Sequence, residues 1–118
     1  MRFDNALIVD NQSVVLTIQS SAITLESMYT YAIQCVFTGA PNGSVKLQGS
    51  CDPGKYINTS TGRDIVNWTD IDGTSTAVVA AGSVMYNMDA QGYKWVRLVY
   101  TASSGTGNLS ARFNGKGV

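Results

Sequence analysis

Asp70 and Asp72 are the residues of this sequence whose type and spacing could do acid–base chemistry, because they alternate along a short stretch just before Gly73. In a glycosidase, one such carboxyl group acts as the acid and the other as the base or nucleophile. The same fragment could begin a calcium loop, but the bidentate Glu that completes such a loop is missing. Asp followed by Gly is also typical of a solvated turn, which is the interpretation we favour.

Other catalytic residue types are scarce. The chain has no histidine, which removes the commonest general base, the commonest zinc ligand and every Ser–His or Cys–His nucleophile. Cys35 and Cys51 are too few for a structural zinc site, and we expect two free thiols, with a disulfide as the alternative. The Gly-rich residues 105–107 join two expected strands and precede no helix, so they form no phosphate loop. We therefore expect no enzyme, no cofactor and no metal.

Aromatic side chains are the second group that could bind a ligand. Their rings could stack on sugars while neighbouring Asn and Asp bind hydroxyl groups; the candidates are Trp68, Trp95, Tyr56, Tyr86, Tyr93 and Tyr100. The alternative is that they fill the core and the sheet faces, since aromatic residues favour strands. We favour a core or interface position for both tryptophans. Tyr56 is the aromatic residue that we most expect to be exposed.

Composition limits the class of protein. The chain has 118 residues, enough for one domain, and 44% of them are apolar. Eight basic residues balance eight acidic ones, so no net field attracts nucleic acid or an anionic membrane. No stretch approaches the ~20 apolar residues of a membrane span. The N-terminal apolar run is too short for a signal peptide, so we expect synthesis in the cytoplasm without export.

The sequence pattern predicts strands for the elements that must position these residues. Residues 14–19 are β-branched and would turn Val14, Leu16 and Ile18 to one side, while residues 31–38 and 44–50 alternate between apolar and polar positions. Residues 41–43, Pro-Asn-Gly, lie between the last two runs and predict a hairpin turn.

The second half continues this pattern. Residues 93–101 form the strongest predicted strand, apolar on both faces and therefore expected to be central. Further strands are expected at residues 65–71, 76–80, 83–88 and 108–114, with a turn at residues 103–107 and a long polar loop at residues 52–64. About eight short strands separated by turns predict one all-β domain over residues 1–118, an antiparallel β-sandwich or jelly roll.

Several sequence phrases carry a resemblance to known proteins. They are SVKLQGS (residues 44–50), NWTDI (67–71), GYKWVRLVYT (92–101), GTGNLSA (105–111) and GKG (115–117). Together they resemble small virion structural proteins of tailed bacteriophages, of the capsid decoration or cement type. The Trp-Thr pair followed by Tyr-X-X-Val-Arg is more loosely similar to discoidin-like carbohydrate-binding sandwiches.

The phage resemblance implies a virion location and a cement role, with many copies bound to the major capsid protein or to other virion proteins and to one another. Residues 1–11 would then be a docking arm through Phe3, Leu7 and Ile8, with an ordinary edge strand as the alternative. Further contact residues are expected around the long loop; they are Tyr56, Arg63 and Trp68. The discoidin-like resemblance implies instead a tail or fibre module that binds host glycan.

Overall fold

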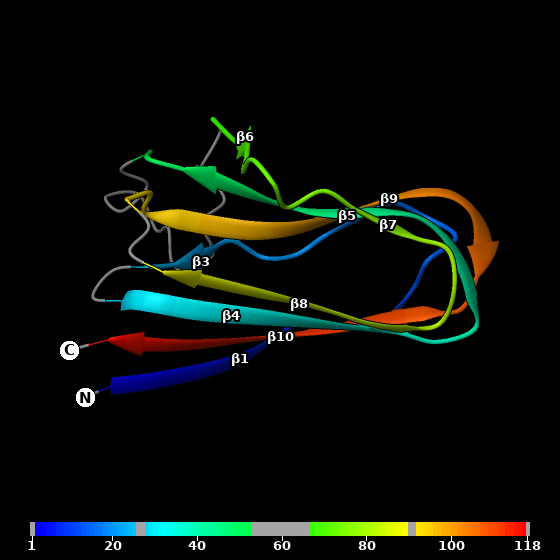
Figure 1. Cartoon of the computed structure of the whole chain (residues 1–118), viewed down its shortest axis with the longest axis horizontal. Coiled ribbons are helices and arrows are strands. Elements are labelled where there is room, and N and C mark those ends of the chain that lie inside the picture. The colour runs from blue at the N-terminus through cyan, green and yellow to red at the C-terminus, as the bar shows by residue number, and fades with distance from the viewer. Residues whose placement is uncertain (1, 26–27, 53–66, 90–91, 118) are drawn as a thin grey trace.

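The computed structural model of the chain describes residues 2–25, 28–52, 67–89 and 92–117. These residues form ten strands and no helix, arranged as two antiparallel sheets that pack face to face (Figure 1). The predicted antiparallel β-sandwich is therefore confirmed, with ten strands where the sequence indicates about eight. No helix in the described ranges is long and apolar enough to cross a membrane.

Both sheets take strands from the two halves of the chain. Sheet A has the order β1 (Arg2–Ser13), β10 (Asn108–Gly117), β4 (Met28–Phe37) and β8 (Gly82–Asp89). Sheet B has the order β2 (Ile18–Gln19), β9 (Trp95–Thr106), β5 (Ala40–Ser50) and β6 (Thr69–Asp70). In addition, β3 (Ile23–Thr24) pairs with β9, and β7 (Thr76–Val78) pairs with β5.

The core follows from the alternation of side chains along the long strands. In sheet A, every second residue of β4 and of β10 points inward and is buried; the pairs in register are Ile33 with Phe113, Cys35 with Ala111 and Phe37 with Leu109. In sheet B, Val45 lies opposite Tyr100 and Leu47 opposite Leu98, and all four are buried. In β4 and β5 these inward positions follow the alternation expected for residues 31–38 and 44–50.

Both cysteines are free, as expected. Cys35 is buried in the core, and burial raises the pKa of its thiol to about 12, so it stays protonated at neutral pH. Cys51 follows β5 and is exposed.

β9 is central in sheet B, with β5 on one side and β2 and β3 on the other. Its inward residues Val96, Leu98 and Tyr100 belong to the core, and Trp95 and Val99, which alternate with them, are buried as well. The prediction that this strand is central is confirmed.

The expected strand at residues 14–19 is largely wrong. Residues 14–17 form a turn, and only Ile18 and Gln19 enter a strand. Val14 and Ile18 are buried, but 71% of Leu16 is exposed, so the three side chains do not share one face. The chain has to cross from sheet A to sheet B here, and this crossing overrides the β propensity of the two valines.

The turn expected at residues 41–43 is also misplaced, and of the turn expected at residues 103–107 only the last residue lies in a connection. Pro41 to Gly43 belong to β5 and pair with β9, which itself continues to Thr106. The tight connections are instead at Gly39 and Gly107, where φ is +77° and +116°. A Cβ atom on Gly107 would lie 1.8 Å from the carbonyl oxygen of Thr38, so no side chain fits between these two connections.

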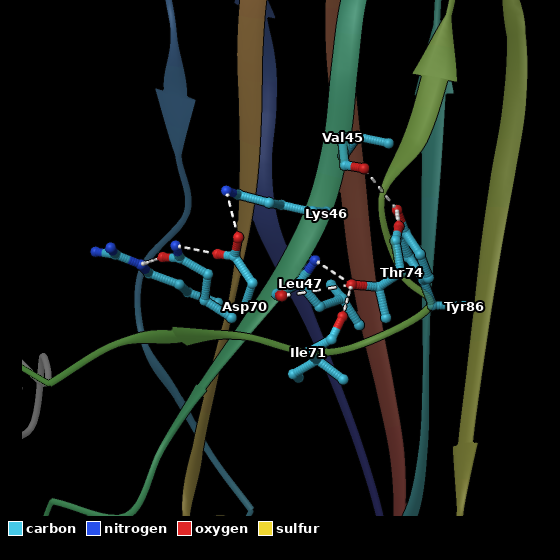
Figure 2. Close-up of polar contacts among 9 residues, drawn as sticks. Val45, Lys46, Leu47, Asp70, Ile71, Thr74 and Tyr86 are labelled. Carbon is cyan, nitrogen blue, oxygen red and sulfur yellow. Dashed lines mark hydrogen bonds and ion pairs between the residues drawn. The ribbon is translucent and has the colours of Figure 1, made fainter.

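Hydroxyl groups bond the two sheets across the core. The Tyr86 hydroxyl of β8 lies 3.1 Å from the carbonyl oxygen of Val45 and 2.7 Å from that of Thr74, both on the side of sheet B (Figure 2). The Tyr31 hydroxyl of β4 lies 2.5 Å from that of Tyr93, which precedes β9. These bonds join the two sheets where side-chain packing alone would allow them to slide.

We predict that Tyr86→Phe lowers the free energy of unfolding by about 1–2 kcal/mol, because two buried carbonyl oxygens lose their shared donor. Equilibrium urea denaturation measures this loss. Tyr29→Phe is the matched control, since Tyr29 is 48% exposed and its substitution should change the midpoint little. Equal midpoints for Tyr86→Phe and the unaltered protein would contradict the inter-sheet role.

Candidate functional site

The residues expected to bind a partner fall into two groups that the structure keeps apart. Phe3, Leu7 and Ile8 belong to β1 of sheet A, and Trp68 directly precedes β6 of sheet B. The remaining candidates, Tyr56 and Arg63, and most of the predicted long loop lie outside the described residues.

β1 is the edge strand of sheet A. It pairs with β10 on one side, while no described strand lies on its other side. The register shifts between Leu7 and Val9 and again before Gln12, and Asn11 has a φ of 50°. Ile8 is half-buried and packs against the core, whereas Leu7 is 44% exposed. Such an edge offers backbone donors and acceptors to an added strand.

A row of polar side chains crosses the outer face of sheet B. The register places Gln48 of β5 between Asp70 of β6 and Arg97 of β9. The Gln48 amide nitrogen donates to Asp70 Oδ1 at 2.8 Å, and its oxygen accepts from Arg97 Nε at 2.8 Å. Lys46 Nζ lies 2.9 Å from Asp70 Oδ2 (Figure 2). We call Lys46, Gln48, Asp70 and Arg97 the polar row.

The turn after β6 holds Asp70 in place. The Ile71 amide donates to the Leu47 carbonyl oxygen at 2.9 Å, which extends the short pairing of β6 with β5. The buried Thr74 hydroxyl donates to the Ile71 carbonyl oxygen at 2.7 Å and accepts from the Leu47 amide at 3.1 Å (Figure 2). Gly73 closes this turn with a φ of +80°, so the predicted turn is confirmed.

The electrostatics of the polar row keep Asp70 ionised, which disfavours a role as a general acid. The hydrogen bond from Gln48, assisted by Lys46, holds the pKa of Asp70 below its usual range, so this carboxylate stays ionised at neutral pH. A general acid needs the opposite shift. The lowered pKa therefore gives the acid–base alternative no support at this residue.

Trp68 extends the row with an aromatic face. The Arg97 guanidinium carbon lies 4.4 Å from the centroid of the Trp68 ring, which is cation–π geometry. Partial burial lowers the pKa of Arg97, yet an arginine remains charged at neutral pH. Trp95, the other predicted aromatic, is buried, and its Nε1 donates to the Asp52 carbonyl oxygen at 3.0 Å.

A cavity of about 460 Å³ adjoins the polar row. It lies where β5 ends beside β6, and its polar lining comes from Ser50, Cys51, Asp52, Asn67, Thr69, Asp70 and Tyr93. The Asp52 carboxylate accepts from the Asn67 backbone amide at 2.9 Å and from its side-chain amide at 3.0 Å. The volume of the cavity is within the range of small-ligand sites. Among the described residues, no three Cys, Asp or Glu side chains lie close enough to hold a metal ion.

Sequence reasoning found Asp70 and Trp68 but missed Lys46, Gln48 and Arg97 as members of one site. Lys46 and Gln48 lie on β5 and Arg97 lies on β9, all three at outward positions of strands whose side chains alternate between the two faces. The alternation itself was visible, but only the register between strands brings them next to Asp70.

Solved structures with the same fold include a prophage-derived protein and a chitosan-binding module. The SPBc2 prophage-derived protein YomS superposes with a TM-score of 0.57 at 9% identity, over 97% of this chain and 96% of that one. Chitosan-binding module 1 of a chitosanase/glucanase from Paenibacillus sp. IK-5 has a TM-score of 0.54 at 18% identity, over 92% of this chain and 74% of that one. Such low identities establish a shared fold alone. No protein-family model and no curated protein sequence matches the chain.

We predict that Gln48→Leu and Lys46→Met each raise the pKa of Asp70 toward its usual value, because each removes a hydrogen bond that lowers it. In the unaltered protein, the Lys46–Asp70 pair is complete above the usual carboxyl pKa and is lost as the pH falls through the lowered one. Carbon-13 NMR titration of the side-chain carboxyl groups measures the change. Gln19→Leu, on β2 away from Asp70, is the control. A titration of Asp70 that none of the variants alters would contradict the assignment.

Proposed function

We propose that this chain is a non-catalytic structural subunit of a tailed-phage particle, a decoration or cement protein that binds the major capsid protein in many copies. The observation that carries the proposal is the edge strand β1, whose outer side faces no described strand and whose Leu7 side chain is 44% exposed. A strand of a shell protein that pairs with β1 would gain main-chain hydrogen bonds along it, and Leu7 would add apolar contact.

The composition supports attachment by surface burial in many copies. The chain carries no net charge, and only 14% of its residues are charged, so neighbouring copies repel one another weakly. A standard interface buries about 800 Å² on each partner. Repetition over a shell lets individually weak contacts add up through avidity. The nearly complete mutual coverage with the prophage-derived YomS fits a subunit of this size, although that likeness concerns the fold.

A second candidate function is glycan binding, in a tail or fibre component. The observation that favours it is the polar row beside Trp68 and the adjoining cavity. The Trp68 ring offers an aromatic surface for a sugar, and the ionised Asp70 and the Asn67 amide supply acceptors and donors for hydroxyl groups. The chitosan-binding module of the same fold is compatible with this alternative.

For the cement proposal, we predict that Leu7→Asp weakens binding to particles that lack this chain at least tenfold, because it places a charge in the apolar part of the interface. Quantitative mass spectrometry of reconstituted particles measures the occupancy. Val36→Asp is the matched control: Val36 is 43% exposed, but on the central strand β4. Hundreds of copies on native particles are expected.

Equal occupancy of the Leu7→Asp chain and the unaltered chain would contradict docking through β1. A handful of copies per particle, in multiples of three or six, would move the chain to the tail or fibre. Absence from particles would overturn the virion proposal altogether.

For the glycan alternative, we predict saturable binding to a host surface polysaccharide that weakens at least tenfold on Trp68→Ala and on Asp70→Asn. Isothermal titration calorimetry after a screen of host glycans measures this. Asp10→Asn on β1 is the control, because Asp10 is exposed on the other sheet. A panel of host polysaccharides that gives no binding at all would rule the alternative out.

A further inference from the structure

The described connections at one end of the sandwich contain no charged residue. The connections after β1, β4, β7 and β9 all cross between the sheets at this end, on the right in Figure 1. Residues 13–17, 37–43, 78–84 and 101–109, which form these connections and their flanks, contain no Asp, Glu, Lys or Arg. All sixteen charged residues of the chain, eight basic and eight acidic, therefore lie elsewhere in the sequence.

An apolar protrusion stands on one side of this end. Val15 and Leu16, in the connection after β1, are 54% and 71% exposed. The backbone beneath them is fixed, because the Val14 amide donates to the Gly107 carbonyl oxygen at 3.0 Å and the Val14 side chain is fully buried. Two large apolar side chains are thus held out into solvent on an anchored turn.

An apolar hollow lies on the other side of the same end. It has a volume of about 240 Å³ and lies at the connection between β7 and β8, with Phe37, Val78, Val79 and Val84 in its lining. Val79, at its rim, is 74% exposed. All residues that line this hollow are uncharged.

The protrusion cannot fill the hollow of its own chain. Leu16 follows β1 and Val79 precedes β8, and these strands form opposite edges of sheet A with β10 and β4 between them. Three strand spacings separate the two edges by roughly 14 Å. A leucine side chain is far too short to span that separation.

We propose that this uncharged end binds a second copy of the same chain about a two-fold axis, so that Leu16 of each copy enters the hollow beside Val79 of the other. In a two-fold contact both copies use the same surface, so a protrusion on that surface needs a matching hollow on it. Both are present here. The proposal is independent of the assignment to a phage particle.

The size and charge of the end fit such a contact. Of the 28 residues in the four segments, 23 are at least partly exposed, which is within the roughly 20–30 residues per side of a standard interface. An uncharged end that meets itself buries no unpaired charge. A nucleic acid or an anionic membrane surface would instead require basic residues, and these four segments have none.

Sedimentation equilibrium of the purified chain tests the proposal. A reversible dimer is expected, and Leu16→Asp and Val79→Asp should each weaken it at least tenfold, because both would bury a charge. Met85→Asp is the matched control, since Met85 is 58% exposed but lies within β8. Far-ultraviolet circular dichroism checks that the variants fold. A chain that stays monomeric at millimolar concentration, or a Met85→Asp variant that dissociates as readily, would overturn the proposal.

Cysteine cross-linking locates the contact itself. The background carries Cys51→Ser, which removes the exposed native thiol, while the buried Cys35 stays protonated and unreactive. In this background, L16C/V79C should form a disulfide-linked dimer on mild oxidation, and L16C/M85C should form far less of it. Equal cross-linking of the two double variants would reject the proposed pairing of Leu16 with Val79.

Discussion

The hydrogen bonds from the Tyr86 hydroxyl to the carbonyl oxygens of Val45 and Thr74 fix sheet A against sheet B at the edge next to the candidate site. Thr74 in turn holds the backbone of Ile71 and Leu47, and this turn directly follows Asp70. The position of an exposed carboxylate on one face of sheet B therefore depends on a tyrosine of the opposite sheet. A buried polar network of this kind specifies one arrangement of the two layers, where apolar packing alone would tolerate several.

The sequence predicted the fold wherever a strand has one buried face. Inward positions such as Ile33 and Cys35 on β4, and Val45 and Leu47 on β5, alternate with outward ones and were correctly assigned. It failed where the chain passes from one sheet to the other. Val14 to Thr17 have the residue types of a strand, and residues 41–43 those of a hairpin turn, but the crossing points are set by the pairing of distant strands and by the close approach of Gly39 to Gly107.

The candidate site could be predicted only where residue type or local turn chemistry indicates it. Asp70 and Trp68 stand out by residue type, and the turn at Gly73 follows from local chemistry. Gln48 and Arg97 are 49 residues apart, and nothing local indicates that one amide would bridge a carboxylate and a guanidinium. That information resides in the register of β6, β5 and β9. The sequence offered an edge strand as the alternative to a docking arm at residues 1–11, and only the order of the whole sheet places β1 at its edge.

The two ends of the chain lie together, opposite the uncharged end, because Arg2 pairs with Gly117 at the start of the β1–β10 ladder (Figure 1). This arrangement gives the domain a direction of mechanical weakness. Tension applied between the two termini would load the hydrogen bonds of this ladder one pair at a time, so that β1 would separate from β10 progressively, starting at Arg2 and Gly117. Tension applied along the strands, between the uncharged end and one terminus, would load the same bonds together in shear. A domain that is held at its uncharged end and by one terminus would thus resist stretching far better than one that is pulled by its two termini.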